Sequence, residues 1–456
     1  MLDNVPQTIT ELSEALHSRK LSPVEVTRAC LQHIDALNPS LNAFITVTAE
    51  LALAQASSAE AEILRGHWRG PLHGVPIGLK DLIDTAGIPT TAASELYKHR
   101  IPTQSAEVVR KLQEAGIILI GKQNLHEFAY GGSSMISAFG PVHNPCDPAC
   151  IAGGSSGGSA AAVGAGLGYA AIGTDTAGSI REPAALCGVV GLKPTYGRVS
   201  ARGVIPLSQS LDHVGPIARN VADLTMLFRA IADGDGVPPA DFLQSWNPPL
   251  KLRVGVPSNF FYDDLDSEVE GAVKSTLRAM KSIAADIRQI TLPIDNDRTV
   301  QAAESYAFHA ATVTKSPELY QPETLRRILT GKKISAEDYR KKRLELDAAR
   351  QEIRAIFDTV DVIVTPTTPI PAPTIAELHT HPEQLRPREL LLLRNTRPFN
   401  VWGLPAISLP CGFTRTGLPI GLQIAAAHGR EDCLLHFAHA CELALALPQP
   451  IRTSSV

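Results

Sequence analysis

Three serines and six glycines fall within fifteen residues, in the segment AGGSSGGSAAAVGAG at positions 152–166. A segment so poor in side chains can cradle a phosphate with its main-chain amides, expose a serine nucleophile, or let a helix pack closely through its small residues. The surrounding sequence discriminates between these three functions.

Phosphate binding is excluded by spacing. The nearest approach to the pattern G-x-x-x-x-G-K-[ST] is GIILIGKQ at 116–123, which ends in Gln123 and has the interior of an apolar strand. The glycine-rich segment also contains no G-x-G-x-x-G, so dinucleotide binding has no support.

The nucleophile-elbow pattern G-x-S-x-G occurs twice, on Ser155 and on Ser156. An α/β-hydrolase needs an apolar strand directly before that elbow, whereas NPCDPACIA contains two prolines and no alternation. Close helix packing suits SAAAVGAG but leaves the cluster of hydroxyls ahead of it unexplained.

Four motifs resemble the amidase signature family of C–N hydrolases, in the same order: HGVPIGLKDLIDTAG, GGSSGGSAAAV, GTDTAGSIREPAALCGVVGLKPTYGRVS and SLDHVGPIARNVADL. The resemblance extends from about residue 21 to about residue 442 and is densest between 70 and 225. It implies a Ser-cisSer-Lys triad in which Lys80 is the base, Ser155 the bridging serine after a cis peptide, and Ser179 the nucleophile. Lysine is a base only when neutral, and the apolar VPIGL before Lys80 fits the burial that lowers a lysine pKa.

The resemblance also implies an oxyanion hole made by the backbone N–H groups of Thr176, Ala177, Gly178 and Ser179. Ala177 stands where the family more often has glycine, so its methyl is expected to narrow the acyl entrance or to require a negative φ.

Residues near the nucleophile are expected to support it. Asp175 and Arg181 flank Ser179 and are interpreted as a supporting charge pair or a simple surface pair, and Ser156 is expected to hydrogen-bond within its loop. His126 and His213 are interpreted as structural or pocket-lining. No metal-ligand set and no cofactor motif is found, so neither a metal nor a cofactor is expected.

The acyl pocket is expected along the loop FAYGGSSMISAFGP and near residues 306–309 and 399–402. Aromatic and methionine side chains there favour an apolar acyl group over a charged one. The predicted lining residues are Phe128, Tyr130, Gly131, Gly132, Met135 and Trp402.

The elements that position these residues alternate between helix and strand. Ser22, Pro23 and Glu25 form a capping box that predicts a helix, residues 45–66 read as a second helix, and a strand is expected to end at Lys80. SAEVVRKLQEAG and IILIGKQN predict a helix followed by a buried strand. A long charged helix is predicted over 315–358, and two strands around a turn at 414–417.

This pattern predicts an α/β fold: a single domain over 1–456 with a central mixed twisted sheet covered by helices on both faces, the amidase signature fold. Core motifs lie at 70–225, a family-variable region at 230–345, and C-terminal strands at 360–430 that complete the sheet.

Composition and charge predict which kinds of partner the protein binds and in which cellular compartment it lies. The 456 residues are 44% hydrophobic with a net charge of −4, so no basic surplus is available to neutralise phosphates and no nucleic acid is expected as a ligand. No stretch approaches eighteen uninterrupted apolar residues, and the N-terminus lacks a cationic region followed by an apolar run, which predicts a cytoplasmic protein without membrane contact. The expected partner is a small-molecule amide, and the resemblance allows a homodimer.

The expected function is hydrolysis of a carboxylic amide to acid plus ammonia or amine through an acyl-serine intermediate. One alternative is the glutaminase component, the A subunit, of a glutamyl-tRNA amidotransferase, although LTGKKISAEDYRKKRLELDAARQEI lacks the tyrosine-dense segment associated with that component. A non-catalytic protein with an amidase fold is the alternative from another class. It would need a lost triad member, and none is lost.

Overall fold

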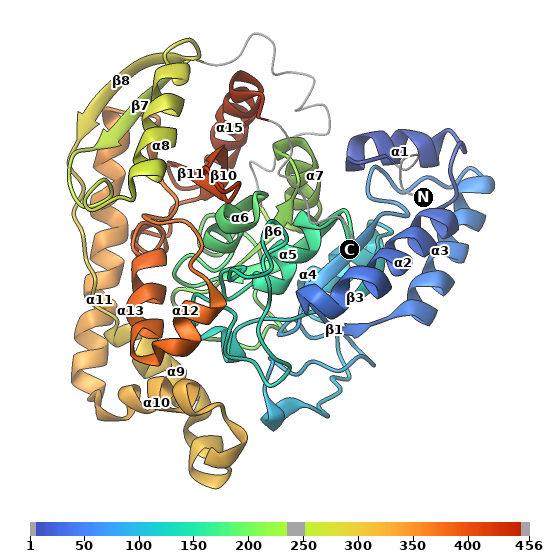
Figure 1. Cartoon of the computed structure of the whole chain (residues 1–456), viewed down its shortest axis with the longest axis horizontal. Coiled ribbons are helices and arrows are strands. Elements are labelled where there is room, and N and C mark those ends of the chain that lie inside the picture. The colour runs from blue at the N-terminus through green and yellow to red at the C-terminus, as the bar shows by residue number, and fades with distance from the viewer. Residues whose placement is uncertain (1–5, 235–250, 448–456) are drawn as a thin grey trace.

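One mixed sheet of eleven strands runs through the molecule in the order β1-β3-β2-β4-β6-β5-β10-β11-β9-β7-β8 (Figure 1). The structure, a computed structural model, describes residues 6–234 and 251–447. The strands are β1 (Phe44–Val47), β2 (Pro76–Lys80), β3 (Ile118–Gln123), β4 (Ala170–Asp175), β5 (Val190–Lys193), β6 (His213–Ala218), β7 (Leu252–Pro257), β8 (Ala284–Ile290), β9 (Val362–Pro366), β10 (Ala406–Phe413) and β11 (Pro419–Ala426).

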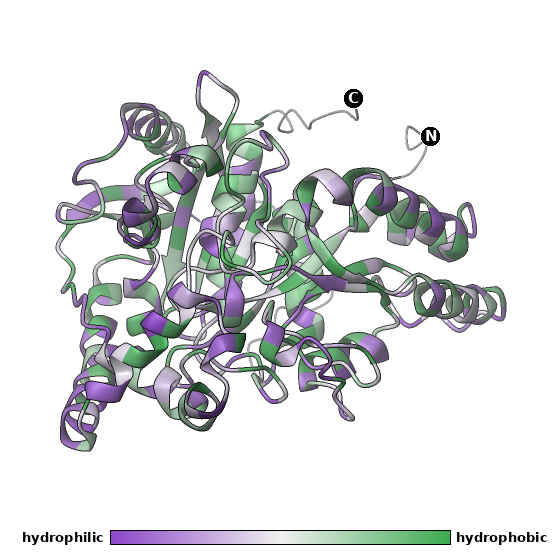
Figure 2. Ribbon diagram, turned by 60° about the horizontal axis from the view of Figure 1, so that its bottom comes forward, coloured by the Kyte–Doolittle hydropathy of each residue, from purple (hydrophilic) through white to green (hydrophobic). Residues whose placement is uncertain are grey.

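Helices flank the sheet (Figure 1), and the ribbon coloured by hydropathy shows many hydrophobic residues along its central strands (Figure 2). Those of the first half are α1 (Ile9–His17), α2 (Pro23–Leu41), α3 (Ala49–Leu64), α4 (Glu107–Glu114), α5 (Gly157–Gly164), α6 (Arg181–Cys187) and α7 (Val221–Ile231). Those of the second half are α8 (Ser267–Met280), α9 (Thr299–Lys315), α10 (Pro322–Thr330), α11 (Ala336–Glu352), α12 (Ile375–Thr380), α13 (Pro382–Leu392), α14 (Pro398–Val401) and α15 (Glu431–Leu445).

Side chains of the central strands alternate between two apolar clusters. In β3, Ile118 and Ile120 pack into the cluster that includes α5 and α6, whereas Leu119 packs into the cluster that includes α4, α7 and α15. Because successive residues of a strand point to opposite faces, both faces of the sheet are buried. This double burial holds the ends of β2 and β4 rigidly where polar residues emerge.

The C-terminal strands complete the sheet, as the sequence predicts. β2 pairs in parallel with β3 and β4, and the antiparallel pair β10–β11 lies between β5 and β9. Strands from both halves of the chain therefore form one continuous surface, and the predicted α/β fold with a single large mixed sheet is confirmed.

Most predicted elements are present, with two corrections. The capping box of Ser22 and Glu25 starts α2, and the turn at 414–417 joins β10 to β11. The helix expected over 45–66 is wrong at its start, because Phe44–Val47 pairs with β3 as a strand. The long helix expected over 315–358 is broken, because Ser335 caps a new helix, α11, and ends the continuity with α10.

Part of the family-variable region expected at 230–345, namely 235–250, lies outside the described residues, as do 1–5 and 448–456. Within the described residues, no helix combines the length and the apolar character needed to span a bilayer.

Candidate active site

Lys80 and Ser155 meet at the carboxyl end of β2. Lys80 is the last residue of that strand and is fully buried, and its Nζ lies 2.7 Å from Ser155 Oγ and 2.8 Å from Thr174 Oγ1. The Gly154–Ser155 peptide bond is cis, as the resemblance implies. Since β2 and β4 are parallel neighbours, their ends bring Lys80 and Thr174 together.

The environment of Lys80 favours the neutral amine. Burial lowers the pKa of Lys80 to about 7, while the negative charges of Asp175 and Asp212 act in the opposite direction. Both direct contacts of Nζ are neutral hydroxyls, and neither stabilises an ammonium as a carboxylate does. A large fraction of Lys80 is therefore unprotonated near neutral pH and able to accept a proton.

Ser179 occupies the turn between β4 and α6, beside the Ser155 loop. Its carbonyl oxygen accepts the N–H of Ser156 at 3.1 Å, and the residue is 4% exposed. Within residues 6–234 and 251–447, no hydrogen bond joins the hydroxyls of Ser155 and Ser179. The structure thus shows the contact between lysine and the bridging serine, and it places the expected nucleophile next to it without the second hydroxyl contact.

In the turn that carries Ser179, one main-chain N–H group is hydrogen-bonded within the turn, and two others have no acceptor among the described residues. Gly178 N–H donates to Asp175 Oδ1 at 2.8 Å, so this amide is engaged internally. For Ala177 and Ser179, the described part of the chain provides no acceptor for the N–H group. Ala177 is not among the residues with positive φ, so its methyl is accommodated. Gly178 has φ +134, and a Cβ there would lie 2.0 Å from Thr396 Oγ1, so glycine is required at that position.

The predicted charge pair of Asp175 and Arg181 is present and fully buried. Arg181 Nη2 lies 2.9 Å from Asp175 Oδ1, and Arg181 Nε lies 3.0 Å from Oδ2. Burial alone raises a carboxyl pKa, but Arg181 holds the pKa of Asp175 well below its usual range. Ser156 Oγ donates to the carbonyl of Thr174 at 3.1 Å, so it fastens its loop to β4.

Arg181 also binds the C-terminal half of the chain. Its Nη1 donates to the carbonyl of Thr396 at 2.9 Å and its Nη2 to Asn400 Oδ1 at 2.7 Å. Gln423 of β11 accepts a further bond from Nη1 at 2.5 Å. The turn carrying Ser179 is therefore held by residues more than two hundred positions away in the sequence.

Asp212 is a site residue that sequence reasoning missed. Its carboxylate accepts the Thr176 hydroxyl at 2.6 Å and the N–H groups of Leu207 and Ser208 at 2.9 and 3.0 Å. Burial raises the pKa of Asp212 to about 6, although these hydrogen bonds oppose the shift. The sequence did contain signals for two such residues. Asp212 lies in the motif SLDHVGP, and Thr174 lies in the motif GTDTAGS.

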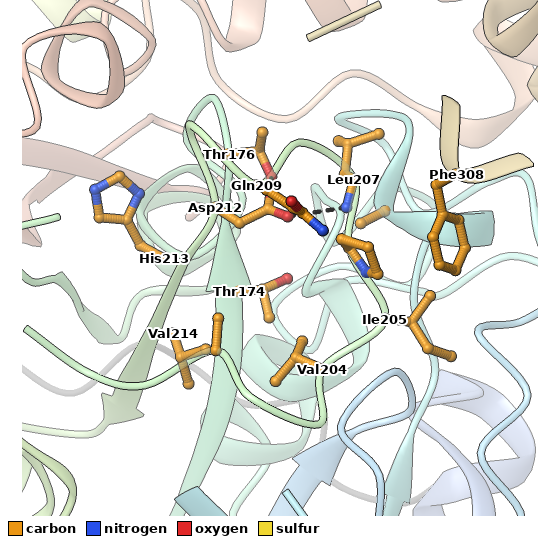
Figure 3. A pocket seen from close by; sticks show the side chains of 13 residues that line it. Thr174, Thr176, Val204, Ile205, Leu207, Gln209, Asp212, His213, Val214 and Phe308 are labelled. Atoms are coloured by element: carbon orange, nitrogen blue, oxygen red, sulfur yellow. Dashed lines mark hydrogen bonds between the residues drawn. The ribbon is translucent and has the colours of Figure 1, made fainter. Parts of the chain in front are cut away.

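A pocket of about 370 Å³ lies beside Thr174 and Thr176 (Figure 3). Figure 3 shows Asp212 next to Thr176, with Ile205 and Phe308 on the opposite side. The pocket therefore has a polar wall next to the contacts of Lys80 and an apolar wall. The full lining is Ala129, Thr174, Thr176, Ala201, Val204, Ile205, Pro206, Leu207, Gln209, Asp212, His213, Val214 and Phe308.

The six residues predicted to line an acyl pocket do not line this one, and they divide into two groups. Phe128 packs against His309 and Tyr320, Met135 lies in an apolar cluster with Ile151, and Trp402 stacks edge-on against Phe399 in another. These three side chains are buried core residues, with exposed fractions of 1% for Phe128, 7% for Met135 and 1% for Trp402.

Tyr130, Gly131 and Gly132 instead belong to a loop beside the segment that carries Ser155, since a Cβ on Gly154 would lie 2.9 Å from the backbone nitrogen of Ser133. A Cβ on Gly131 would lie 2.1 Å from the His126 ring, and one on Gly132 would lie 3.0 Å from Leu393. The His126 pKa is lowered well below its usual value by burial and nearby cations, so the ring is neutral. It serves as a packing surface for the loop. Burial also lowers the pKa of His213 well below its usual value. Its Nδ1 lies 2.7 Å from the carbonyl oxygen of Leu211 and 3.1 Å from that of Asp175.

The known proteins that this chain resembles are amidases and A subunits of amidotransferases. The family model described as Amidase matches residues 25–435. The A subunit of glutamyl-tRNA(Gln) amidotransferase from Geobacter sp. (strain M21) is 39% identical over 95% of this chain and 96% of its own length. A crystal structure of an amidase superposes with a TM-score of 0.87 at 34% identity, over 96% of this chain and 100% of that chain. The A subunit of the Thermotoga maritima glutamyl-tRNA(Gln) amidotransferase gives 0.79 at 32% identity, over 98% of both chains.

Proposed function

Because the chain belongs to the amidase family, we propose that it cleaves the C–N bond of a carboxylic amide through an acyl-Ser179 intermediate, as the A subunit of an amidotransferase acting on glutamyl-tRNA(Gln). The chemistry rests on the 2.7 Å contact between Lys80 Nζ and Ser155 Oγ in a fully buried setting. The role in an amidotransferase rests on full-length relatives of that name that are 39% identical to this chain.

In the proposed reaction, neutral Lys80 accepts the proton of Ser155 while Ser155 accepts the proton of Ser179. Ser179 Oγ then attacks the amide carbonyl, and the free N–H groups of Ala177 and Ser179 stabilise the oxyanion. Return of the proton along the same path releases ammonia, and water hydrolyses the acyl-serine. The hydroxyl contact between Ser155 and Ser179 is expected to form when substrate binds, since catalytic hydrogen bonds often tighten only in the complex.

The expectation that nucleic acid plays no part, and that a small molecule is the sole partner, is wrong. Relatives that match this chain over nearly its whole length are named as subunits of an amidotransferase of glutamyl-tRNA(Gln). Net charge describes the surface of one chain, so a net charge of −4 does not exclude work on a tRNA inside an assembly whose other subunits contact it.

The amidotransferase role is tested by exchanging one subunit of a related enzyme for this chain. The chain is added to the remaining subunits of the Geobacter amidotransferase in place of the related subunit of that enzyme, with glutamine as nitrogen donor. We expect amidation of glutamyl-tRNA(Gln) to be restored, and Ser179→Ala to abolish it. Absence of amidation alongside normal glutamine hydrolysis would remove the amidotransferase role and keep the chemistry.

A free-standing amidase is the second candidate, and one observation favours it. The crystal structure of an amidase superposes better than the Thermotoga maritima amidotransferase subunit does, with TM-scores of 0.87 and 0.79. The isolated chain would then hydrolyse simple amides at full rate without any partner. A glutaminase that is silent until the other subunits are added would count against this candidate.

A further inference from the structure

Two hydrogen bonds join the segment of Ser155 to the segment of Ser179, one on each side of Ser155 in the sequence. On the carboxyl side, the N–H of Ser156 donates to the carbonyl of Ser179 at 3.1 Å. On the amino side, the N–H of Gly154 donates to Glu182 Oε2 at 2.7 Å. The first bond joins two main chains, whereas the second depends on a side chain. A substitution at Glu182 therefore removes one of these connections and leaves the other.

The main chain of Glu182 is held by the turn that carries Ser179. Glu182 is the second residue of α6, and its N–H donates to the carbonyl of Gly178 at 2.8 Å. The residue before it, Arg181, is fully buried and bonded to the second half of the chain. The carboxyl of Glu182 thus has a fixed base next to the expected nucleophile, and it extends from there to Gly154.

The carboxyl of Glu182 packs against the glycines that precede Ser155. A Cβ on Gly153 would lie 2.7 Å from Glu182 Oε2 and 2.8 Å from Oε1. From another side, a Cβ on Gly154 would lie 2.8 Å from the backbone nitrogen of Ser134. The segment before Ser155 is therefore enclosed between the Glu182 side chain and the main chain at Ser134. Loss of the carboxyl would give this segment room to shift.

Glu182 is a neutral acid in this setting. It is fully buried, and its Oε1 has no hydrogen-bond partner within the described residues. Burial raises the pKa of Glu182 well above its usual value, the negative charges of Glu389 and Asp175 act in the same direction, and the N–H of Gly154 opposes them. A neutral acid accepts this N–H through an uncharged oxygen, as the side-chain amide of glutamine also can. Glutamine is therefore the conservative replacement, whereas methionine has a similar length and no oxygen.

We propose that Glu182 is a positioning residue for proton transfer. By fixing Gly154, it holds the Ser155 hydroxyl in contact with Lys80 and within reach of the Ser179 proton. A misplacement of roughly 1 Å costs about 100-fold in rate. The loss is expected in kcat, because Ser155 relays a proton during the reaction and does not bind the amide beforehand. This role rests on the proposed hydrolytic function and deepens it.

Three substitutions at Glu182 test this role, with glutamine and butanamide as substrates. Glu182→Met removes the acceptor, and kcat is expected to fall roughly 100-fold with KM little changed. Glu182→Gln keeps the acceptor and is expected to retain most of kcat. Glu182→Asp shortens the side chain by one methylene and is expected to lose roughly tenfold. Full kcat in Glu182→Met, or in Glu182→Asp where the methionine variant does not fold, would overturn the role, as would a glutamine variant as slow as the methionine variant.

The matched control is Glu431→Met, at the first residue of α15. Glu431 is also fully buried, and it accepts the main-chain N–H of Thr195 at 2.8 Å. Its second oxygen has no hydrogen-bond partner in the described part of the chain and lies 4.0 Å from Arg198 Nε. Urea unfolding is expected to show destabilisation of both methionine variants, with kcat unchanged in Glu431→Met. An equal fall of kcat in Glu431→Met would attribute the effect to general destabilisation and overturn the role of Glu182.

A labelling reaction separates this role from amide hydrolysis. With an alkyl fluorophosphonate, Ser179 Oγ bonds to phosphorus, the phosphorus–fluorine bond breaks to release fluoride, and the Ser179 proton passes through Ser155 to Lys80. The labelling rate, followed by mass spectrometry, is expected to fall in Glu182→Met and to be kept in Glu182→Gln. Equal rates in all three proteins would overturn the positioning role. The expected order of rates in a protein that hydrolyses no amide would overturn the hydrolytic function and retain the positioning role.

Discussion

At the scale of single residues, Lys80 combines complete burial with two hydroxyl contacts and no ion pair within 4.0 Å in the described chain. Its pKa of about 7 is a balance between burial, which lowers it, and the charges of Asp175 and Asp212, which raise it. Because the base must be neutral, activity is expected to follow the deprotonated fraction of this one amine.

The first prediction concerns the acid limb of the pH profile. Below pH 7, log kcat/KM is expected to rise by about one for each pH unit, and to level off above the pKa of Lys80. Asp212→Asn removes a negative charge that stabilises the ammonium, so the limb is expected to move about half a unit toward lower pH. The measurement is kcat/KM from pH 5 to 9 for both proteins.

The matched control for that profile is Asp84→Asn. Asp84 pairs with Arg100 at 2.6 Å and is not among the charges that shift the pKa of Lys80. The acid limb of the Asp84→Asn profile is expected to coincide with that of the unmutated protein. A limb that stays fixed in Asp212→Asn as well would disprove the electrostatic influence of Asp212 on Lys80.

A second prediction at this scale is that Lys80→Met stabilises the fold while abolishing activity. Between pH 7 and the ordinary lysine pKa of 10.5, the unfolded chain binds a proton at Lys80 that the folded chain lacks, so unfolding is favoured at lower pH. The stability gained by Lys80→Met is therefore expected to shrink by about 1.4 kcal/mol per unit from pH 7 to 9. Urea unfolding at both pH values measures it, and a gain independent of pH would contradict it.

Residue types in motifs were sufficient to predict Lys80, Ser155 and Ser179, because each lies in a short segment whose letters carry the resemblance. The partners of Arg181 could not be predicted in this way. Thr396, Asn400 and Gln423 lie more than two hundred positions from Arg181, and only the fold brings them together. The apolar acyl group expected from the sequence reflected aromatic residues that the structure places in the core.

At the scale of elements, the glycine-rich segment serves two functions. Ser155 and Ser156 supply hydroxyls before α5, and Gly158 lets α5 approach the backbone of its neighbours. A Cβ on Gly158 would lie 2.4 Å from the carbonyl oxygen of Asn124 and 2.6 Å from that of Ala43. The placement of the expected catalytic hydroxyls and the close packing of α5 therefore depend on the same short segment.

The third prediction compares two helical glycines. Gly158→Ala is expected to lower the free energy of unfolding by about 2 kcal/mol, because the backbone atoms it meets cannot move aside easily. Gly271→Ala, in α8 with open space around its Cβ position, is expected to raise it by about 0.5–1 kcal/mol. Urea unfolding reports both, and a neutral Gly158→Ala would show that α5 can shift.

Element boundaries were predictable where a local signal marks them and uncertain elsewhere. The capping box of Ser22 and Glu25 located the start of α2. The break between α10 and α11 was missed, because the charged residues around it have good helix propensity and the cap at Ser335 is a single hydroxyl. The strand at 44–47 was missed because its pairing partner, β3, is distant in the sequence.

At the scale of the whole molecule, both halves of the chain share one sheet, and Arg181 is bound by Thr396, Asn400 and Gln423 from the second half. The expected site is thus incomplete in either half alone. One cooperative unfolding transition is expected, because separating the halves would leave the edge of β5 without its partner β10 and would remove the acceptors that the second half gives to Arg181.

The fourth prediction tests this cooperativity. Two variants each retain one tryptophan, Trp68 beside His17 in the first half or Trp402 in the core of the second. In each variant the urea midpoint from fluorescence is expected to coincide with the midpoint from far-ultraviolet circular dichroism. A Trp68 signal that changes well before the circular dichroism would reveal an independently unfolding N-terminal half.

The pairing of β5 with β10 has a consequence for biosynthesis. β5 ends at Lys193 and β10 begins at Ala406, so a ribosome adds roughly 200 residues between them, which takes about ten to forty seconds at 5–20 residues per second. Throughout that interval the nascent polypeptide presents an open strand edge flanked by apolar side chains. Chaperone occupancy during translation is therefore expected to peak before residue 406 emerges and to fall once the hairpin of β10 and β11 docks.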